Sequence, residues 1–135
     1  MSNDAFETTV QIRRNDFDAS GHLYHGEYLT LIDEARGRFL MGPIINAPHS
    51  SYVVARIEID YLSMILLKSR QVSVRIETGP RLGTSSFELI ETVFAGDTVH
   101  ARTRTVAVMW DTKRGCSRPM SELERMELTK HRHME

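Results

Sequence analysis

The sequence is poor in cysteine and proline and contains no long apolar run, since it has one cysteine and four prolines among 135 residues. Because Cys116 is alone, no disulfide can form within the chain, which is typical of proteins of the reducing cytosol. No apolar stretch reaches the length of a membrane span, and residues 1–4 lack the basic and apolar segments of a signal peptide. The sequence therefore predicts a cytoplasmic protein without a membrane partner.

An excess of either charge is also absent, because the formal net charge is -1. This balance argues against nucleic acid as the main partner. The sequence has no G-x-S-x-G nucleophile elbow, no glycine-rich phosphate loop and no HExxH motif. His22 and His25 are three residues apart, but no cluster of further ligand residues accompanies them, so we expect no metal and no separate cofactor. The length predicts a single domain over residues 1–135.

Hydrophobic periodicity predicts how the elements follow one another along the chain. Apolar and polar residues alternate with the period of a strand at 6–14, 52–61, 72–77, 87–94 and 99–109. A run at 25–41 has the helical period instead, and a short helix is expected near the end. A single long helix before an antiparallel series cannot alternate as βαβ units do. The order therefore predicts an α+β fold in which a five-stranded antiparallel sheet curves around one long helix.

Local signals set the expected boundaries of these elements. Gly42-Pro43 ends the long helix, and Gly79-Pro80 is expected to break the strand that begins at Val72. Ser121 and Glu124 have the spacing of a capping box, which predicts a short helix ending near Lys130. The remaining residues, 131–135, are expected to be loose.

Side-chain patterns also predict faces and packing. Val53, Ala55, Ile57, Ile59 and Tyr61 are expected to share one face of their strand. In the last strand, the second face changes from polar at His100, Arg102 and Arg104 to apolar at Val106, Val108 and Trp110. We expect a subunit partner to cover the apolar half. Inside the long helix, Gly37 is interpreted as a close packing contact, and Glu34 is expected to pair with Arg38.

Reactive side chains gather in the loop between the first strand and the long helix. Asp18, Ser20 and Gly21 favour a tight polar turn. The loop ends where a helix begins, and free backbone N–H groups at that point can stabilise negative charge. The residues alone leave two interpretations open: a turn whose aspartates cap a helix, or a site that performs chemistry.

The same loop resembles the hotdog-fold thioesterases, in particular the group typified by 4-hydroxybenzoyl-CoA thioesterase and the Tol-Pal-associated acyl-CoA thioesterase. The matching pattern is Asp16-x-Asp18-x-x-Gly21-His22-x-Tyr24-His25-x-x-Tyr28, followed by Glu34-Ala35-Arg36. Two further matches are Ile57-x-Ile59-x-Tyr61-Leu62 and Arg81-Leu82-Gly83-Thr84-Ser85-Ser86-Phe87. The resemblance covers essentially the whole chain and implies the hotdog fold. One departure is Ser63-Met64 with Lys68-Ser69-Arg70, where the family often has a proline and a Gly-Asp turn.

The resemblance implies an acyl-CoA thioesterase in which Asp18 is the catalytic carboxylate and the backbone N–H of His25 polarises the thioester carbonyl. We expect the substrate to be bound by Asp16, Tyr24, His22, Tyr28, Tyr61, Arg81 and Ser85. Arg81 is included as a basic side chain for the phosphates of coenzyme A, and Tyr61 could instead be a core or interface residue. Coenzyme A is then part of the substrate, and the protein is expected to be a homodimer or a homotetramer built as a dimer of dimers, with sites at subunit interfaces.

Several alternatives stay open at this stage. Asp18 could activate water as a general base or attack the carbonyl directly. A hotdog dehydratase acting on hydroxyacyl thioesters and a non-catalytic acyl-CoA-binding protein are the competing functions. The acyl group, and the choice between coenzyme A and acyl carrier protein, are not fixed by the sequence.

Overall fold

The computed structural model describes residues 5–66 and 68–133, so the expectations for residues 1–4 and 134–135 lie outside the described residues. The strands are β1 (Phe6–Gln11), β2 (Ser50–Tyr61), β3 (Gln71–Leu82), β4 (Ser86–Ala95), β5 (Thr98–Asp111) and β6 (Cys116–Ser117). The helices are the 3-10 helix η1 (Arg14–Asp16) and the α-helices α1 (His25–Leu40) and α2 (Glu122–Lys130).

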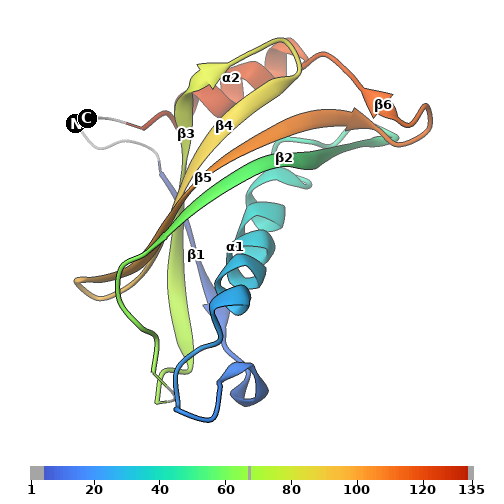
Figure 1. The fold of residues 1–135 in the computed structure, drawn as a ribbon. Coiled ribbons are helices and arrows are strands. Elements are labelled where there is room, and N and C mark those ends of the chain that lie inside the picture. Colours follow the sequence, from blue (N-terminus) through green and yellow to red (C-terminus); the bar gives the residue numbers. More distant parts are fainter. Residues whose placement is uncertain (1–4, 67, 134–135) are drawn as a thin grey trace.

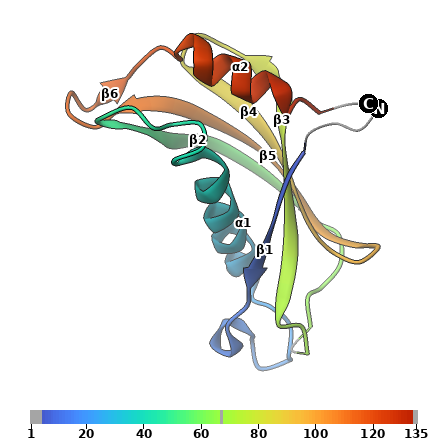
Figure 2. The same ribbon diagram turned by 180° about the vertical axis from the view of Figure 1, so that it is seen from behind.

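The strands form one antiparallel sheet in the order β1-β3-β4-β5-β2, and β6 pairs with the end of β5. The sheet curves around α1, while α2 lies over the end of the sheet formed by β3 and β4 (Figures 1 and 2). This arrangement confirms the predicted α+β fold with an antiparallel sheet around one long helix. The short strand β6 was not predicted. No helix in the described ranges is both long and apolar enough to cross a membrane.

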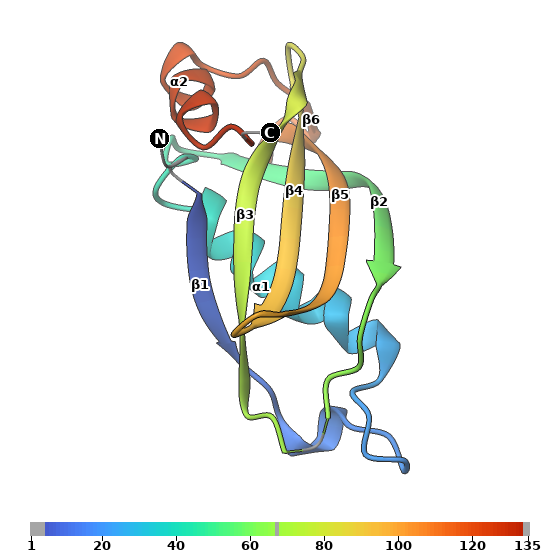
Figure 3. The same ribbon diagram turned by 90° about the vertical axis from the view of Figure 1, so that its left-hand side faces the viewer.

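The core lies between α1 and the concave face of the sheet. The buried residues of α1 are Tyr28, Leu31, Ile32, Ala35, Arg36, Phe39 and Leu40. Buried residues of three strands, among them Val74, Leu89 and Met109, belong to the same hydrophobic cluster. Because α1 crosses the sheet obliquely (Figure 3), its first turn lies beside the end of β2. This packing decides where the start of the helix, and with it the reactive loop, is held.

The first strand is shorter than predicted. It ends at Gln11 rather than Arg14 because the chain turns into η1. The carboxylate of Asp16 accepts hydrogen bonds from the backbone N–H of Arg13 at 3.3 Å and from the guanidinium of the same residue. These bonds close a tight turn in place of the last strand residues.

The predicted face of β2 is wrong in its first half. The pairing with β5 shifts between Val54 and Arg56, so Ala55 is an extra residue in the strand. Val53 pairs with Val108, and it therefore lies on the face opposite to that of Ile57. A bulge of this kind cannot be read from alternation, because it inverts the pattern at one residue.

The predicted break at Gly79-Pro80 is also wrong, because β3 continues to Leu82. The register with β4 shifts between Thr78 and Leu82, so the strand passes the proline through an irregular stretch rather than ending. In this stretch Gly79 leaves room for the side chain of Glu88, since a Cβ atom there would lie 2.5 Å from its Oε1.

Residues 131–133 are more ordered than predicted. The N–H of Thr78 donates to the carbonyl of His131 at 2.8 Å, and the N–H of His133 donates to the carbonyl of Thr78 at 2.8 Å. The short helix before them is confirmed, with the reciprocal capping box of Ser121 and Glu124.

Two expectations inside α1 have opposite outcomes. The predicted ion pair of Glu34 with Arg38 is present. Gly37, in contrast, is not a close packing contact, because a Cβ atom there would have Tyr52 Oη as its nearest neighbour at 4.0 Å.

Candidate active site

The loop before α1 is a tight turn that is closed around Asp18. Its side-chain Oδ1 accepts hydrogen bonds from the backbone N–H groups of Ser20 at 2.9 Å and His22 at 3.1 Å. The N–H of Asp18 donates to the carbonyl of His22, and Gly21 has a positive φ of 80° that the reversal requires. Asp18 therefore does stabilise the turn, but it uses only one of its two carboxylate oxygens for this. Within the described residues, Oδ2 has no hydrogen-bond partner, so it is free to act on a ligand.

The start of α1 offers an uncapped donor. Its N-cap residue, Tyr24, makes no side-chain capping bond, and the N–H of Tyr24 donates to the carbonyl of Asp16 at 3.0 Å. His25 is the first helical residue, and its N–H finds no acceptor in the part of the chain that the structure describes. Such a group, with the helix dipole behind it, favours negative charge.

Tyr61, near the end of β2, joins the sheet to this helix start. Its hydroxyl donates to the carbonyl of His25 at 3.0 Å. Its ring lies edge-on to the rings of Tyr28 at 5.1 Å and His25 at 6.3 Å. Loss of solvent around the hydroxyl, reinforced by the neighbouring tyrosines, raises the pKa of Tyr61 above its ordinary value. The phenol therefore stays protonated and keeps its bond to the helix.

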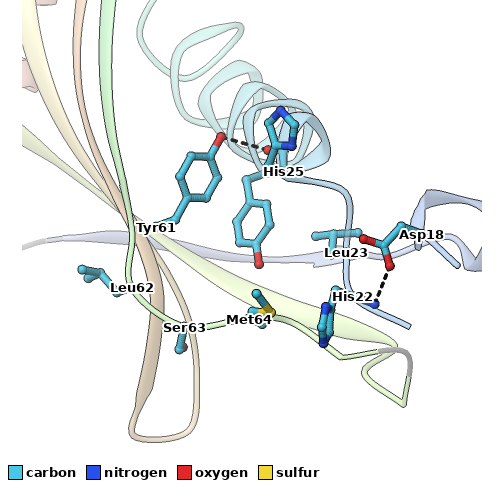
Figure 4. Close-up of a pocket in the computed structure, with 9 residues that line it drawn as sticks. Asp18, His22, Leu23, His25, Tyr61, Leu62, Ser63 and Met64 are labelled. Atoms are coloured by element: carbon cyan, nitrogen blue, oxygen red, sulfur yellow. Dashed lines mark hydrogen bonds between the residues drawn. The ribbon is translucent and has the colours of Figure 1, made fainter. Parts of the chain in front are cut away.

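These groups surround one cavity of about 370 Å³ (Figure 4). It is lined by Asp18, His22, Leu23, His25, Tyr28, Tyr61, Leu62, Ser63 and Met64. The loop and the helix start provide the titratable side chains of Asp18, His22 and His25. The segment after β2 provides the apolar side chains of Leu62 and Met64. A mostly apolar cavity with a few convergent polar groups is the usual form of a small-molecule site.

The structure thus brings together five of the residues that the sequence predicted, namely Asp18, His22, His25, Tyr28 and Tyr61. Tyr24 is exposed, with its ring 4.4 Å from that of His25. Asp16 does not line the cavity, and its carboxylate pairs with Arg13 at 3.3 Å.

Two further predicted residues, Arg81 and Ser85, do not line this cavity within a single chain. Arg81 is at the end of β3 and Ser85 directly precedes β4, so both lie at the end of the sheet opposite to the loop of Asp18 (Figure 1). Arg81 lines a separate cavity of about 420 Å³ together with Arg56, Glu58 and Arg104. A single chain therefore does not bring these two residues to the cavity.

Sequence reasoning did not assign Leu23, Leu62, Ser63 and Met64 to the site. The last two were noticed only as a departure from the family pattern. Ser63 is already occupied, because its Oγ donates to the carbonyl of Val99 at 2.9 Å and contacts Nδ1 of His100 at 3.0 Å. Among the described residues, no group of three or more His, Cys, Asp or Glu side chains is placed to hold a metal ion.

Known structures with this fold include proteins that bind coenzyme A. A thioesterase from Thermus thermophilus, solved with coenzyme A and zinc, is 30% identical, with a TM-score of 0.78 over 94% of this chain and 98% of that one. A Staphylococcus aureus protein in complex with CoA is 14% identical, with a TM-score of 0.85 over 99% and 89% of the two chains. A 1,4-dihydroxy-2-naphthoyl-CoA thioesterase from Synechocystis is 16% identical, with a TM-score of 0.74 over 93% and 96%. No curated protein sequence matches the chain.

Sequence comparison identifies the family independently of the fold. Residues 12–128 match the profile of the Thioesterase-like superfamily. This match includes the loop of Asp18, the whole of α1 and all but the first strand of the sheet. The cavity at the start of α1, the antiparallel sheet around that helix and the profile match lead to one conclusion: the chain belongs to the Thioesterase-like superfamily.

Proposed function

We propose that the protein is an acyl-CoA thioesterase that hydrolyses an acyl or aroyl thioester to the free acid and coenzyme A. One observation carries the proposal: Asp18, whose Oδ2 has no partner among the described residues, and His25, whose N–H has none there either, line the same cavity. Thioester hydrolysis needs both kinds of group, a base or nucleophile and a donor for the oxyanion. The coenzyme A complexes of the Thermus and Staphylococcus structures support the choice of substrate.

In the general-base route, Asp18 takes a proton from water while the water oxygen bonds to the thioester carbonyl. The carbonyl oxygen becomes an oxyanion that accepts a hydrogen bond from the His25 N–H. When the tetrahedral intermediate collapses, the C–S bond breaks, and the thiolate of coenzyme A takes up the proton to leave as the thiol. In the nucleophilic route, Asp18 bonds to the carbonyl carbon, the C–S bond breaks and coenzyme A leaves as the thiolate. Water then hydrolyses the anhydride to the Asp18 carboxylate and the free acid, and a proton of that water converts the thiolate into the thiol. In a single turnover in H₂¹⁸O, label in Asp18 identifies the nucleophilic route, because only an anhydride that water opens at the Asp18 carbonyl carbon places ¹⁸O in that side chain.

The loop bonds have a role in both routes. Two backbone N–H groups hold Oδ1 of Asp18, so the carboxylate has a fixed orientation and presents Oδ2 to the ligand. Leu23, Leu62 and Met64 form the apolar part of the cavity, where the acyl group would lose contact with water. Neither a metal nor a separate cofactor is needed for this chemistry.

We further propose that the active unit is a dimer formed along β2. This strand pairs only with β5, so its other edge is open among the described residues, and Val53 and Val54 are exposed on it. A long edge strand with exposed apolar side chains is a template for pairing with another strand. A second copy of this chain is the proposed occupant, in the closed two-fold arrangement that most dimers adopt.

Such a dimer would also explain the position of Arg81 and Ser85. The start of β2 and the turn between β3 and β4 lie at the same end of the sheet, because Ser50 pairs with Asp111 and Ser86 pairs with Val108. Antiparallel pairing of β2 with its copy would set the Tyr61 end of one strand beside the Ser50 end of the other. The partner's Arg81 and Ser85 would then approach the cavity of Asp18.

The test of the reaction is thiol release from short, medium and long acyl-CoAs and from benzoyl-CoA. Wild type and Asp18→Asn are compared, and the fold of the variant is checked by circular dichroism. We expect turnover by the wild type and a loss of at least about 100-fold in the variant. Binding of acyl-CoA by both proteins without thiol release would instead identify a binding protein. Loss of water from a 3-hydroxyacyl-CoA would identify a dehydratase.

The test of the dimer is the molar mass in solution, measured by light scattering for wild type and Val54→Lys. A charge on the edge strand opposes strand pairing, so the variant should shift toward the monomer and lose activity together with the dimer. A monomeric wild type that is fully active would overturn this part of the proposal.

A further inference from the structure

The hydroxyl proton of Tyr28 has no acceptor among the described residues. The side chain is 4% exposed and lines the cavity. Its Oη accepts a hydrogen bond from the N–H of Ile65 at 3.1 Å, and within residues 5–66 and 68–133 this is the only hydrogen bond that the hydroxyl makes. A buried donor that is left unpaired is costly. The missing acceptor is therefore expected to be an atom of the ligand.

The second tyrosine of the cavity, Tyr61, has an acceptor for its hydroxyl proton. Tyr61 already donates its hydroxyl proton to the carbonyl of His25. The two rings lie at 87° to each other with centroids 5.1 Å apart, so they share one environment. They differ in what is left for a ligand, because Tyr28 has a free donor and Tyr61 has none.

The position of Tyr28 places this donor near the start of α1. Tyr28 follows His25 by three residues, about one turn of the helix, and helical side chains point back toward the N-terminus. Ile65, which donates to Tyr28, accepts a hydrogen bond from the N–H of Leu23 at 2.9 Å. The hydroxyl is thus anchored through Ile65 next to Leu23, two residues before His25, and Tyr28 and His25 line the same cavity.

We propose that the Tyr28 hydroxyl and the His25 N–H donate together to the carbonyl oxygen of the bound thioester. The two groups then form a two-donor oxyanion hole, in which Tyr28 is a catalytic residue. This assignment rests on the proposed function for the identity of the ligand as a thioester. Both hydrogen bonds strengthen as negative charge develops on the oxygen.

Two uncleavable ligands separate the carbonyl contact from general binding. A ketone analogue of octanoyl-CoA, with CH₂ in place of the thioester sulfur, keeps the carbonyl. The thioether S-octyl-CoA lacks it. We expect Tyr28→Phe to weaken binding of the ketone about fivefold to tenfold and to leave binding of the thioether unchanged. Tyr61→Phe is the matched comparison, and it should change the affinities for the two ligands by the same factor.

Three outcomes would overturn the assignment of Tyr28 as a donor to the carbonyl oxygen. It is wrong if Tyr28→Phe weakens the two ligands equally or not at all, or if the wild type binds neither. If Tyr28→Phe does not fold, the wild type alone decides: the ¹³C=O stretch of the bound ketone should move to lower frequency than in water, and an unshifted band overturns the assignment.

Turnover is measured separately and reports on the proposed function. With a thioester substrate, Tyr28→Phe should lower kcat about 100-fold, the usual effect of removing one oxyanion donor. If the wild type binds the ketone through Tyr28 and yet releases no thiol from any acyl-CoA, the thioesterase proposal and the catalytic role of Tyr28 fail, while its hydrogen bond to the ligand carbonyl holds.

Discussion

Arg36 of α1 and Glu91 of β4 form an ion pair that is completely enclosed by the core. The Nε atom of Arg36 donates to Glu91 Oε2 at 2.6 Å, and Nη2 donates to Oε1 at 3.0 Å. Hydroxyl groups of Thr103 and Thr105 donate to the same carboxylate. Burial alone would lower the pKa of Arg36, but the hydrogen bond and charge of Glu91 outweigh it and raise that pKa above its ordinary value. The pair fixes α1 at one position along the sheet.

We predict that Arg36→Met destabilises the protein by about 3–5 kcal/mol, because it leaves the carboxylate of Glu91 buried and uncompensated. The double variant Arg36→Met with Glu91→Met should recover most of this loss, since an apolar pair of similar volume needs no partner. Urea unfolding monitored by circular dichroism measures both. A double variant as unstable as Arg36→Met alone would contradict the explanation.

Asp18→Asn should keep the fold of the loop. Asparagine Oδ1 can accept the same two hydrogen bonds from Ser20 and His22 that Asp18 accepts. We therefore expect a Tm close to that of the wild type, whereas Asp18→Ala should lose about 1 kcal/mol of stability because both N–H groups lose their acceptor. Differential scanning calorimetry of the three proteins tests this, and it shows whether lost activity can be assigned to the charge.

The ion pair of Glu124 with Arg118 should make stability depend on pH. Arg118 donates to both carboxylate oxygens at 2.8 and 2.7 Å. Burial alone would raise the pKa of Glu124, but hydrogen bonds from Arg118 and Ser121 lower it below the ordinary value of 4.5. A carboxyl with a lowered pKa stabilises the fold when it is ionised, so this contribution is complete above pH 4.5 and is lost as the pH falls through the folded-state pKa.

The measurement is the Tm of wild type and Glu124→Gln from neutral pH down to about pH 3. The difference between the two should be constant above pH 4.5 and shrink below it. Glu122→Gln, an exposed change in the same helix, is the matched control. A difference that grows on acidification would contradict the sign of the shift.

Gly37→Ala should stabilise the protein by about 0.5–1 kcal/mol, because alanine is the better helix former and restricts the unfolded chain. The nearest atom to the added methyl group is Tyr52 Oη at 4.0 Å, an ordinary contact. Thermal unfolding measures the effect. A lower Tm would mean that Tyr52 cannot tolerate even this contact.

The sequence was sufficient where a residue interacts with its near neighbours. Glu34 pairs with Arg38 four positions along one helix, and Ser121 caps with Glu124 three positions on. It was also sufficient for the alternation along β5, where Ala107 and Met109, on the face opposite to Val106 and Val108, are fully buried. In each case a fixed period of the helix or strand decides which side chains meet.

Contacts between distant segments could not be predicted in this way. Glu91 lies 55 positions from Arg36, and nothing in their local sequences pairs them. The extra residue in β2 at Ala55 and the passage of β3 through Pro80 depend on what the neighbouring strands allow. For the site, the loop motif pointed to Asp18 and His25, whereas the contribution of Met64 depends on where the segment after β2 is held.

Both ends of the described chain are fastened to the same strand. Phe6 pairs with Ile76 of β3, and Arg132 forms a bridge with Thr78 two residues further on. The two ends of the described chain therefore lie close together. A chain that began at another point of the same fold could place the same strands side by side. A short linker between the ends, with a new opening at the exposed turn of Gly96, would give a circular permutant whose cavity is built from the same residues.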